Sequence, residues 1–368
     1  MTFNLRLHLL LPAFGALALL AAGCSRPAAP SVDPTPVDAQ TASTPPRTEE
    51  APPAAPPEPE KLDLRYNVST GQKYPMEMVK DQLIEITVRG QVSPTQRIEI
   101  IEGTWEILET RVYREFFNAR FTFDRIRFHE PNPRGSVTYD SATDDSPPES
   151  DRAIILAGFV GNSIDVTITP SGRIVDVRET ADMREDILAA LAAHSHFNNE
   201  KALERARTET LSDESLSLLL ETYLTTLPGT IFRIGDQWTE LRPLPDLASM
   251  NHRTIHVVRR EGDRIIVQRD SVMHPAGEEG VMGRRLDDML TMVIDSGEAK
   301  TTTIVDVNTG WVQEAETQGM TRARLTLSNG RSANMADPPM TTTEKVTVRL
   351  LTEGREATGN FPPGGSVE

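Results

Sequence analysis

The chain has 368 residues, of which 25% are charged and 38% hydrophobic, and its formal net charge at pH 7 is −16. This acidic balance argues against a nucleic-acid partner, because phosphate binding needs clustered Lys and Arg side chains, and equally against electrostatic docking on anionic lipid. The single cysteine excludes an intrachain disulfide and a zinc site built from cysteines. A folded part of roughly 290 residues can bury a sizeable core without such crosslinks.

The first 24 residues have the composition of an export signal. Arg6 supplies a charged start, an apolar run extends from Leu9 to Leu20, and three small residues then lead to Cys24. The run is shorter than the about 20 apolar residues that a transmembrane helix needs. A charged start, an apolar middle and a small-residue end are typical of a secretory signal.

The end of this segment resembles the lipobox of bacterial lipoproteins, in which the cysteine after a small residue is acylated and becomes the mature N-terminus. It departs from the commonest pattern because Ala21 takes the place usually held by leucine. The resemblance implies that residues 1–23 form a lipoprotein signal peptide. It also implies that Cys24 carries fatty acyl chains such as palmitate, which anchor the chain in a membrane at about 0.8 kcal/mol for each buried CH₂ group. An ordinary secreted protein with an incidental cysteine is the alternative.

Ser25 follows that cysteine, and by analogy with enterobacterial lipoprotein sorting it favours the outer membrane, with the protein facing the periplasm.

The next segment, residues 24–60, is predicted to be a tether, since positions 25–60 contain eleven prolines and no aromatic residue. Such a sequence cannot bury enough apolar surface to fold, so we expect a disordered, partly polyproline II linker. A proline-rich ligand for a partner domain is the alternative.

Alternating apolar and polar residues, the period of a half-buried strand, begin at residue 62 and recur along the chain. They cover Leu62 to Val68, Ile84 to Val88, Phe117 to Phe123 and Ile164 to Ile168. Turn sequences separate such runs: Pro170-Ser171-Gly172, Glu261-Gly262-Asp263, Asn308-Thr309-Gly310 and Asn329-Gly330. Because strands and helices do not alternate regularly, we expect antiparallel meanders and not a doubly wound parallel sheet.

Two helices interrupt the strands. The first begins near Asp182 and Glu185, and the second begins after Ser212 and ends at Pro228-Gly229. Each has an apolar stripe broad enough to pack onto a sheet, formed by Met183, Ile187, Leu188 and Leu191 in the first and by Leu216, Leu219, Leu220, Tyr223, Leu224 and Leu227 in the second.

The segments on either side of the helices share a pattern. Thr70–Tyr74 opens the first and Ile234–Trp238 opens the second, and each ends in a hairpin, Ile164 to Val177 and Thr301 to Val312. We predict an α+β fold, mostly antiparallel β, whose two β-meander halves reflect either an internal duplication or coincidence. The predicted boundaries are 61–179 for the first half, 180–228 for the helical segment, 229–353 for the second half and 354–368 for a disordered tail.

These elements together resemble an uncharacterised family of bacterial envelope lipoproteins. The resemblance rests on the lipobox, on the two late hairpins, and on the sequences Leu64-Arg65-Tyr66, Gly71-Gln72-Lys73-Tyr74 and Gly235-Asp236-Gln237-Trp238. It spans about residues 62–351. Because the family has no assigned activity, the resemblance implies no catalytic residues.

Histidines are the first candidates for chemistry. His194 and His196 are two positions apart, which places them on different sides of a helix, so they can ligate one ion only in a loop. His252 and His256 share a face of a predicted strand but lie too far apart for one metal, and His274 is isolated in a turn-like sequence. We expect surface or helix-end histidines and no metal site.

Other chemistry-bearing patterns are absent or weak. The sequence has no Gly-x-Ser-x-Gly elbow, Walker loop or dinucleotide fingerprint, so we predict no catalytic residue and no cofactor. The acidic pairs Asp144-Asp145 and Asp287-Asp288 are typical of a solvated surface. Catalytic carboxylates are the alternative for these pairs. For the acidic loop Asp140–Asp151 a weak calcium site is a further alternative. Large apolar side chains usually anchor the core, and we expect this of Trp105, Trp238, Trp311, Met76, Met78, Met289 and Met292.

The sequence therefore favours a lipid-anchored protein of the bacterial cell envelope with a non-catalytic binding or scaffolding module. A curved sheet carrying helices on one side offers a concave site for a lipid or another apolar ligand. The alternative is an envelope hydrolase that acts on a cell-wall or surface polymer. The sequence does not identify a protein partner.

Overall fold

The computed structural model describes residues 61–88, 90–111, 116–132, 135–145, 150–193, 200–244, 249–275, 282–285, 290–327 and 339–351. The predicted signal peptide, Cys24, the tether and the tail lie outside these residues. So do several other predicted features: His194, His196, Asp287, Asp288, Met289 and the Asn329-Gly330 turn.

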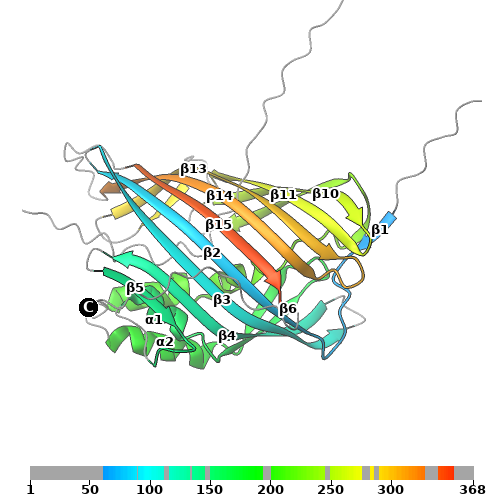
Figure 1. Ribbon diagram of the computed structural model, residues 1–368, viewed down its shortest axis with the longest axis horizontal. Coiled ribbons are helices and arrows are strands. Elements are labelled where there is room, and N and C mark those ends of the chain that lie inside the picture. Colours follow the sequence, from blue (N-terminus) through cyan, green and yellow to red (C-terminus); the bar gives the residue numbers. More distant parts are fainter. Residues whose placement is uncertain are drawn as a thin grey trace, which may run out of the picture.

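One large antiparallel sheet dominates the described chain, which confirms the predicted fold class. It has thirteen strands, eleven of them in the order β7-β6-β4-β3-β2-β15-β14-β13-β11-β10-β9, while β5 pairs with β4 and β12 with β13. Figure 1 shows its longest strands running side by side. The sheet passes from the first meander to the second through the pairing of β2 with β15, the last strand in the described part of the chain.

The strands are β1 (Lys61–Leu64), β2 (Lys73–Val88), β3 (Gln91–Arg111), β4 (Phe116–Asn132), β5 (Gly135–Asp140), β6 (Ser163–Ile168), β7 (Ile174–Arg178), β8 (Thr230–Arg233), β9 (Gln237–Leu244), β10 (Ser249–Glu261), β11 (Arg264–Pro275), β12 (Met282–Arg285), β13 (Leu290–Asp306), β14 (Val312–Leu327) and β15 (Pro339–Leu350). The helices are α1 (Asp151–Ala157), α2 (Ala181–Ala193), α3 (Glu200–Arg205) with the π-helical turn η3 (Ala206–Thr210), and α4 (Asp213–Glu221).

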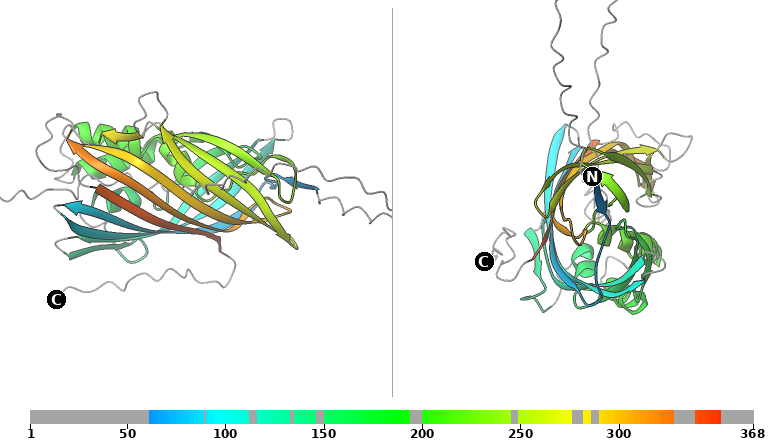
Figure 2. Two further views of the ribbon diagram at one scale, coloured as in Figure 1. Left: turned by 90° about the horizontal axis from the view of Figure 1, so that it is seen from above. Right: turned by 90° about the vertical axis from the view of Figure 1, so that its right-hand side faces the viewer.

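The sheet is curled, and the other elements lie on its concave side (Figure 2). The helices lie within the curl formed by the strands of the first meander. β1 and β8 pair with each other as a separate two-stranded sheet. Of the helices in the described part of the chain, none is long and apolar enough to cross a bilayer.

Alternation along each strand decides which side chains point into the concave side. In β15 the residues Met340, Thr342, Glu344, Val346 and Val348 are buried, while the residues between them are more exposed. The period of two places each such set on one face of the sheet. The buried face therefore carries charged and hydroxyl side chains as well as apolar ones.

The apolar core lies between this concave face and the helices. Its largest members include Trp105, Trp311, Tyr223, Phe121 and Phe123. Trp105 and Trp311 are at most 1% exposed and their rings lie 6.1 Å apart, which confirms two of the three predicted tryptophan anchors. Met76, Met78 and Met292 are also buried, as predicted.

Both predicted helices are present, although one is shorter than expected. The predicted stripe of α2 is buried, and Ser212 caps α4 by accepting a hydrogen bond from the Ser215 N–H. α4 ends at Glu221, whereas we expected it to continue to Pro228. After Glu221 the N–H groups of Thr222, Tyr223 and Leu224 donate to carbonyls three residues earlier, so tight turns replace the α-helical pattern.

The two meanders begin with the same hydrogen-bonding pattern. Gly71 precedes β2 and donates its N–H to the carbonyl of Ile107 on β3, while Gly235 precedes β9 and donates to the carbonyl of Val257 on β10. Both glycines have positive φ, +84° and +92°. This equivalence is what the proposed internal duplication requires.

The two late hairpins also meet at one place. The segment after β1 runs between them: the Tyr66 N–H donates to the Pro170 carbonyl of one turn and the Asn67 N–H to the Thr309 carbonyl of the other, both at 2.8 Å. The Tyr66 ring is buried and packs edge-on against Trp311, with 5.6 Å between the ring centroids. We call residues 64–67 the clamp segment, because it ties both meanders together.

Gly310 is required where its turn meets the clamp segment. Its φ is +70°, and a Cβ there would lie 2.2 Å from the Arg65 carbonyl oxygen. We predict that Gly310→Ala lowers the free energy of unfolding by about 3 kcal/mol, the sum of a left-handed backbone cost and overpacking. Gly262→Ala is the matched control, since Gly262 has φ +61° with nothing within 4 Å of its Cβ position; it should cost about 1 kcal/mol in urea unfolding. Equal losses for the two variants would contradict the close approach.

Candidate functional site

The concave face of the sheet carries two groups of buried charged side chains. Buried charges are costly unless they are paired and hydrogen-bonded. A group in which every charge has a partner inside the fold is explained by the structure itself, whereas a group with an unpaired charge is a candidate binding site. The first group lies on β2, β3, β4, β15 and α1, and the second lies where α4 and the Gly172 turn face β9, β10 and β11.

The first group is balanced. Lys80 pairs with Glu344 at 2.9 Å, Arg152 with Glu99 at 2.7 Å, and Arg97 with Glu130 at 2.6 Å, which gives three cations and three carboxylates. Burial alone would raise the pKa of Glu99, but the ion pair with Arg152 and the charges of Lys80 and Arg97 overcome it and lower the pKa to about 2. We regard this group as structural.

Because it contains Glu99, this group makes the free energy of unfolding depend on pH in the acidic range. Because the pKa of Glu99 is lowered in the folded chain, its contribution is present above its ordinary pKa of 4.5 and is lost as the pH falls toward 2. Between pH 6 and pH 3 the free energy of unfolding of the unmodified protein should decrease. We predict that in the Glu99→Gln variant this decrease is smaller by about 2 kcal/mol. Urea unfolding at several pH values measures this difference.

Glu106→Gln is the control, since Glu106 pairs with Lys73 on the exposed surface at 3.3 Å. It should follow the pH profile of the unmodified protein. A Glu99→Gln profile parallel to that profile would show that Glu99 is not the titrating group.

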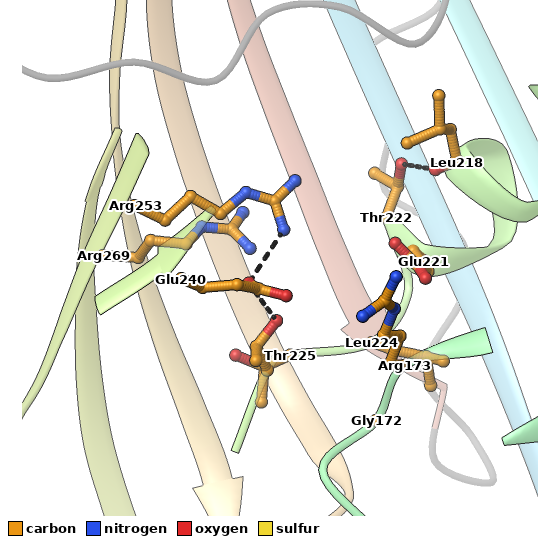
Figure 3. A pocket seen from close by; sticks show the side chains of 11 residues that line it. Gly172, Arg173, Leu218, Glu221, Thr222, Leu224, Thr225, Glu240, Arg253 and Arg269 are labelled. Atoms are coloured by element: carbon orange, nitrogen blue, oxygen red, sulfur yellow. Dashed lines mark hydrogen bonds and ion pairs between the residues drawn. The ribbon is translucent and has the colours of Figure 1, made fainter. Parts of the chain in front are cut away.

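The second group surrounds a small pocket of about 30 Å³. Figure 3 shows it between the strands on one side and α4 with the Gly172 turn on the other. Its walls come from both meanders and from the helical segment, and they are formed by Gly172, Arg173, Leu218, Glu221, Thr222, Leu224, Thr225, Thr226, Glu240, Arg253 and Arg269.

The clamp segment also positions a wall of this pocket. The Tyr66 hydroxyl donates to the Thr225 carbonyl and accepts from the Thr225 N–H, at 3.2 and 2.9 Å. Gly172 lies against the same group: a Cβ there would be 2.5 Å from the Thr225 carbonyl oxygen and from the Tyr66 ring. The pocket wall is therefore fixed by the contacts that hold the two meanders together.

Both carboxylates of the pocket are held in ion pairs. Glu221 accepts from the Ile174 N–H at 3.1 Å and pairs with Arg242 at 2.8 Å. Glu240 pairs with Arg253 at 3.3 Å and accepts from the Thr226 hydroxyl at 3.3 Å. Burial raises the pKa of Glu221 in spite of Arg242.

Arg269 is the unbalanced member of the group. Its guanidinium donates a hydrogen bond to the Thr301 hydroxyl at 3.2 Å, and no described carboxylate lies within ion-pair distance of it. Burial and the positive charge of Arg253 lower the pKa of Arg269 to about 9. Arg242, Arg253 and Arg269 thus share two carboxylates, which leaves one excess positive charge.

Some polar atoms around the pocket lack partners among the described residues. The Nε atoms of Arg253 and Arg269 are buried without a hydrogen bond, as are Ser271 Oγ and Asn251 Oδ1 on the neighbouring part of the same face. The Nε atoms of Arg127 and Arg349, away from the pocket, are buried in the same way, so the excess positive charge at Arg269 is what distinguishes the pocket. The arrangement can hold a polar group by donating to it.

The residues singled out in the sequence lie elsewhere. His252 and His256 are on the outer face of β10. His274 is not isolated in a loop as expected: it lies in β11, with its ring 6.0 Å from that of His252. No cluster of three metal-ligating side chains is present within the described ranges. Trp238 is only partly buried, against Phe232.

The acidic loop after β5 has a structural explanation. Arg125 donates to both oxygens of Asp140, at 2.9 and 2.6 Å. Asp144 accepts from the Asp140 N–H, and Asp144 and Asp145 are exposed. These carboxylates therefore stabilise a turn and face solvent.

Sequence reasoning missed the pocket residues. A signal was present in β10, where Asn251, Arg253, Ile255 and Val257 alternate along one face and all are buried. A charged residue in phase with buried apolar residues indicates a charge inside the fold. The carboxylate that pairs with this charged side chain is decided by the packing of α4 against the sheet. The alternation within one strand carries no information about that packing.

Residues 115–312, 198 of the 368, match the model of a family of unknown function (DUF6263). No curated protein matches this chain. Among solved structures, one of lipovitellin and its lipid interactions is 8% identical with a TM-score of 0.39, and the match covers 80% of this chain but only 26% of the lipovitellin chain. DynF from the dynemicin pathway of Micromonospora chersina is 8% identical with a TM-score of 0.19, covering 82% of this chain and 94% of DynF.

The outer membrane protein OprD from Pseudomonas aeruginosa is 5% identical with a TM-score of 0.20, covering 79% of this chain and 97% of OprD. All three TM-scores are below 0.5.

Proposed function

The chain belongs to the DUF6263 family of unknown function, and we propose that it is a lipid-anchored binding protein of the bacterial cell envelope. Its ligand in this proposal is an amphiphile, a molecule with a polar end and an apolar part. The observation that carries the proposal is a pocket inside the fold whose charged wall has buried polar atoms without partners among the described residues.

The proposed cellular location rests on the N-terminal sequence. A cysteine at the end of a short apolar run, followed by a proline-rich segment, favours acylation of Cys24 and a tether that holds the folded part away from the bilayer. Ser25 favours the outer membrane, facing the periplasm. The formal charge of −16 gives the protein no electrostatic affinity for anionic lipid, so the acyl chains have to supply the attachment.

The proposed ligand class follows from the lining of the concave face. Leu218 and Leu224 line the pocket beside its charged residues. A second apolar group, outside the main core, lies on the same face of the sheet near the ends of β2, β13 and β15, and includes the flexible side chains of Met292 and Met340. Methionine adapts to varied apolar shapes, so this face suits a ligand with polar and apolar parts.

Native mass spectrometry of the full chain purified from membranes tests this function. We expect a co-purifying amphiphile of defined mass, in addition to the acyl groups on the cysteine. Gly310→Ala should lower its occupancy, because loosening the clamp segment releases the Thr225 wall of the pocket. Gly262→Ala should retain it. Protein that carries no bound molecule under any mild extraction would contradict the proposal.

One observation favours a hydrolase as the second candidate. The pKa of Glu221 is raised by burial, and the charge of Glu240 across the pocket raises it further, as in enzymes that use one protonated and one ionised carboxyl group. The ion pairs of both carboxylates and the small volume of the pocket argue against it. Cleavage of an envelope polysaccharide that is lost in Glu221→Gln would replace the binding proposal with this one.

We predict that Cys24→Ala releases the protein from membranes without unfolding it. The variant lacks the thiol that carries the acyl chains in this proposal, and the described fold, which begins at Lys61, makes no use of that thiol. Membrane fractionation with labelled palmitate measures both the release and the loss of label. Ser25→Asp is the companion variant, which should keep the label but move the protein to the inner membrane. Retention of Cys24→Ala in membranes would refute the anchor.

A further inference from the structure

We propose that the pocket between α4 and strands β9–β11 binds an anionic oxygen group, a carboxylate or a phosphate, at the polar end of the ligand. This inference rests on the proposed function, because it names the chemistry of the group that enters the pocket.

The charge balance of the pocket favours an anion. Arg242 and Arg253 each have a carboxylate partner, in Glu221 and Glu240, whereas Arg269 has none among the described residues. Exposed Arg173 adds a further positive charge at the rim. The first group, with three cations and three carboxylates, and a further set in which Arg127 and Arg349 pair with Glu77 and Glu102, show that this fold can balance its internal charges. The excess at Arg269 is therefore specific to the pocket.

The geometry suits an oxyanion. Figure 3 shows the guanidinium groups of Arg253 and Arg269 side by side at the edge of the pocket. The Arg253 side chain is 8% exposed, and the buried Nε atoms of both arginines have no hydrogen-bond partner in the described chain. Guanidinium groups bind carboxylates and phosphates by paired N–H donation. Two guanidinium groups on paired strands, of which that of Arg269 has no carboxylate partner among the described residues, form a site for an anion's oxygens.

The size of the pocket limits what enters it. A cavity of about 30 Å³ holds roughly two water-sized groups, since each needs about 10–15 Å³. Two oxygens of a carboxylate or of a phosphate ester fit this space, whereas an acyl chain does not. The chain of the ligand must therefore lie outside the pocket, and only its charged end reaches the arginines.

Calorimetric titration of the full chain in neutral detergent, washed free of bound ligand, tests the inference. The probes are hexanoate, hexanol of the same chain length without the charge, acetate and inorganic phosphate. We expect hexanoate to bind at least tenfold more tightly than hexanol. In Arg269→Gln this preference should disappear, because the unpaired guanidinium that prefers an anion is gone.

Arg264→Gln is the matched control, an exposed arginine of the same strand, and should bind all probes as the unmodified protein does. Arg269→Lys keeps the charge without the paired donors and should bind hexanoate with intermediate affinity; its result decides the question if Arg269→Gln does not fold, as judged by its melting temperature.

The outcomes separate this inference from the proposed function. Equal binding of hexanoate and hexanol would overturn the anion site and leave the amphiphile proposal standing. Binding of acetate or phosphate, with hexanoate no tighter than acetate, would support the anion site and contradict the amphiphile. Phosphate binding more tightly than acetate would assign a phosphate-bearing group, either free or on a lipid headgroup. Full hexanoate affinity in Arg269→Gln, or no binding of any probe, would overturn the site.

Discussion

The contact on which the rest of the structure depends is the clamp segment, residues 64–67, between the two hairpin turns. Its backbone N–H groups donate to one carbonyl in each turn, and the Tyr66 hydroxyl exchanges two hydrogen bonds with Thr225. Both turns have a glycine where a side chain would collide with this segment or its neighbours. A long antiparallel sheet has only neighbouring strands to fix its curvature, so a segment that joins distant turns also fixes the shape of the concave face.

Burial of charge on that face divides into two cases with different physical consequences. Where each cation has a carboxylate partner, as with Arg152 and Glu99, the pair is compensated and holds a helix onto the sheet. Arg269 has no such partner among the described residues, so the folded chain carries a desolvation cost that the proposed ligand anion would reduce.

The proposed anchor and the proposed pocket fit one physical picture. Acylation of Cys24 would confine the chain to a membrane surface, and the proline-rich segment would separate the folded part from it. A module that takes the charged end of an amphiphile has its ligand supply at the same membrane. The acidic surface keeps the module itself off anionic lipid, while the arginines inside the fold present the opposite charge only to a group that enters the pocket.

The sequence alone determined the strand class of the fold, the turns at Gly172, Gly262 and Gly310, and the buried stripe of α2, because these depend on local periodicity and backbone conformation. It also contained the lipobox-like sequence that ends at Cys24. The acylation of Cys24 stays a prediction, since this residue lies outside the described part of the chain. Only the tertiary structure decided that β15 pairs with β2 to make one sheet and that Arg269 faces the pocket with no carboxylate partner among the described residues. Those facts depend on contacts between residues far apart in the chain, and local patterns do not specify which distant strand or side chain becomes the neighbour.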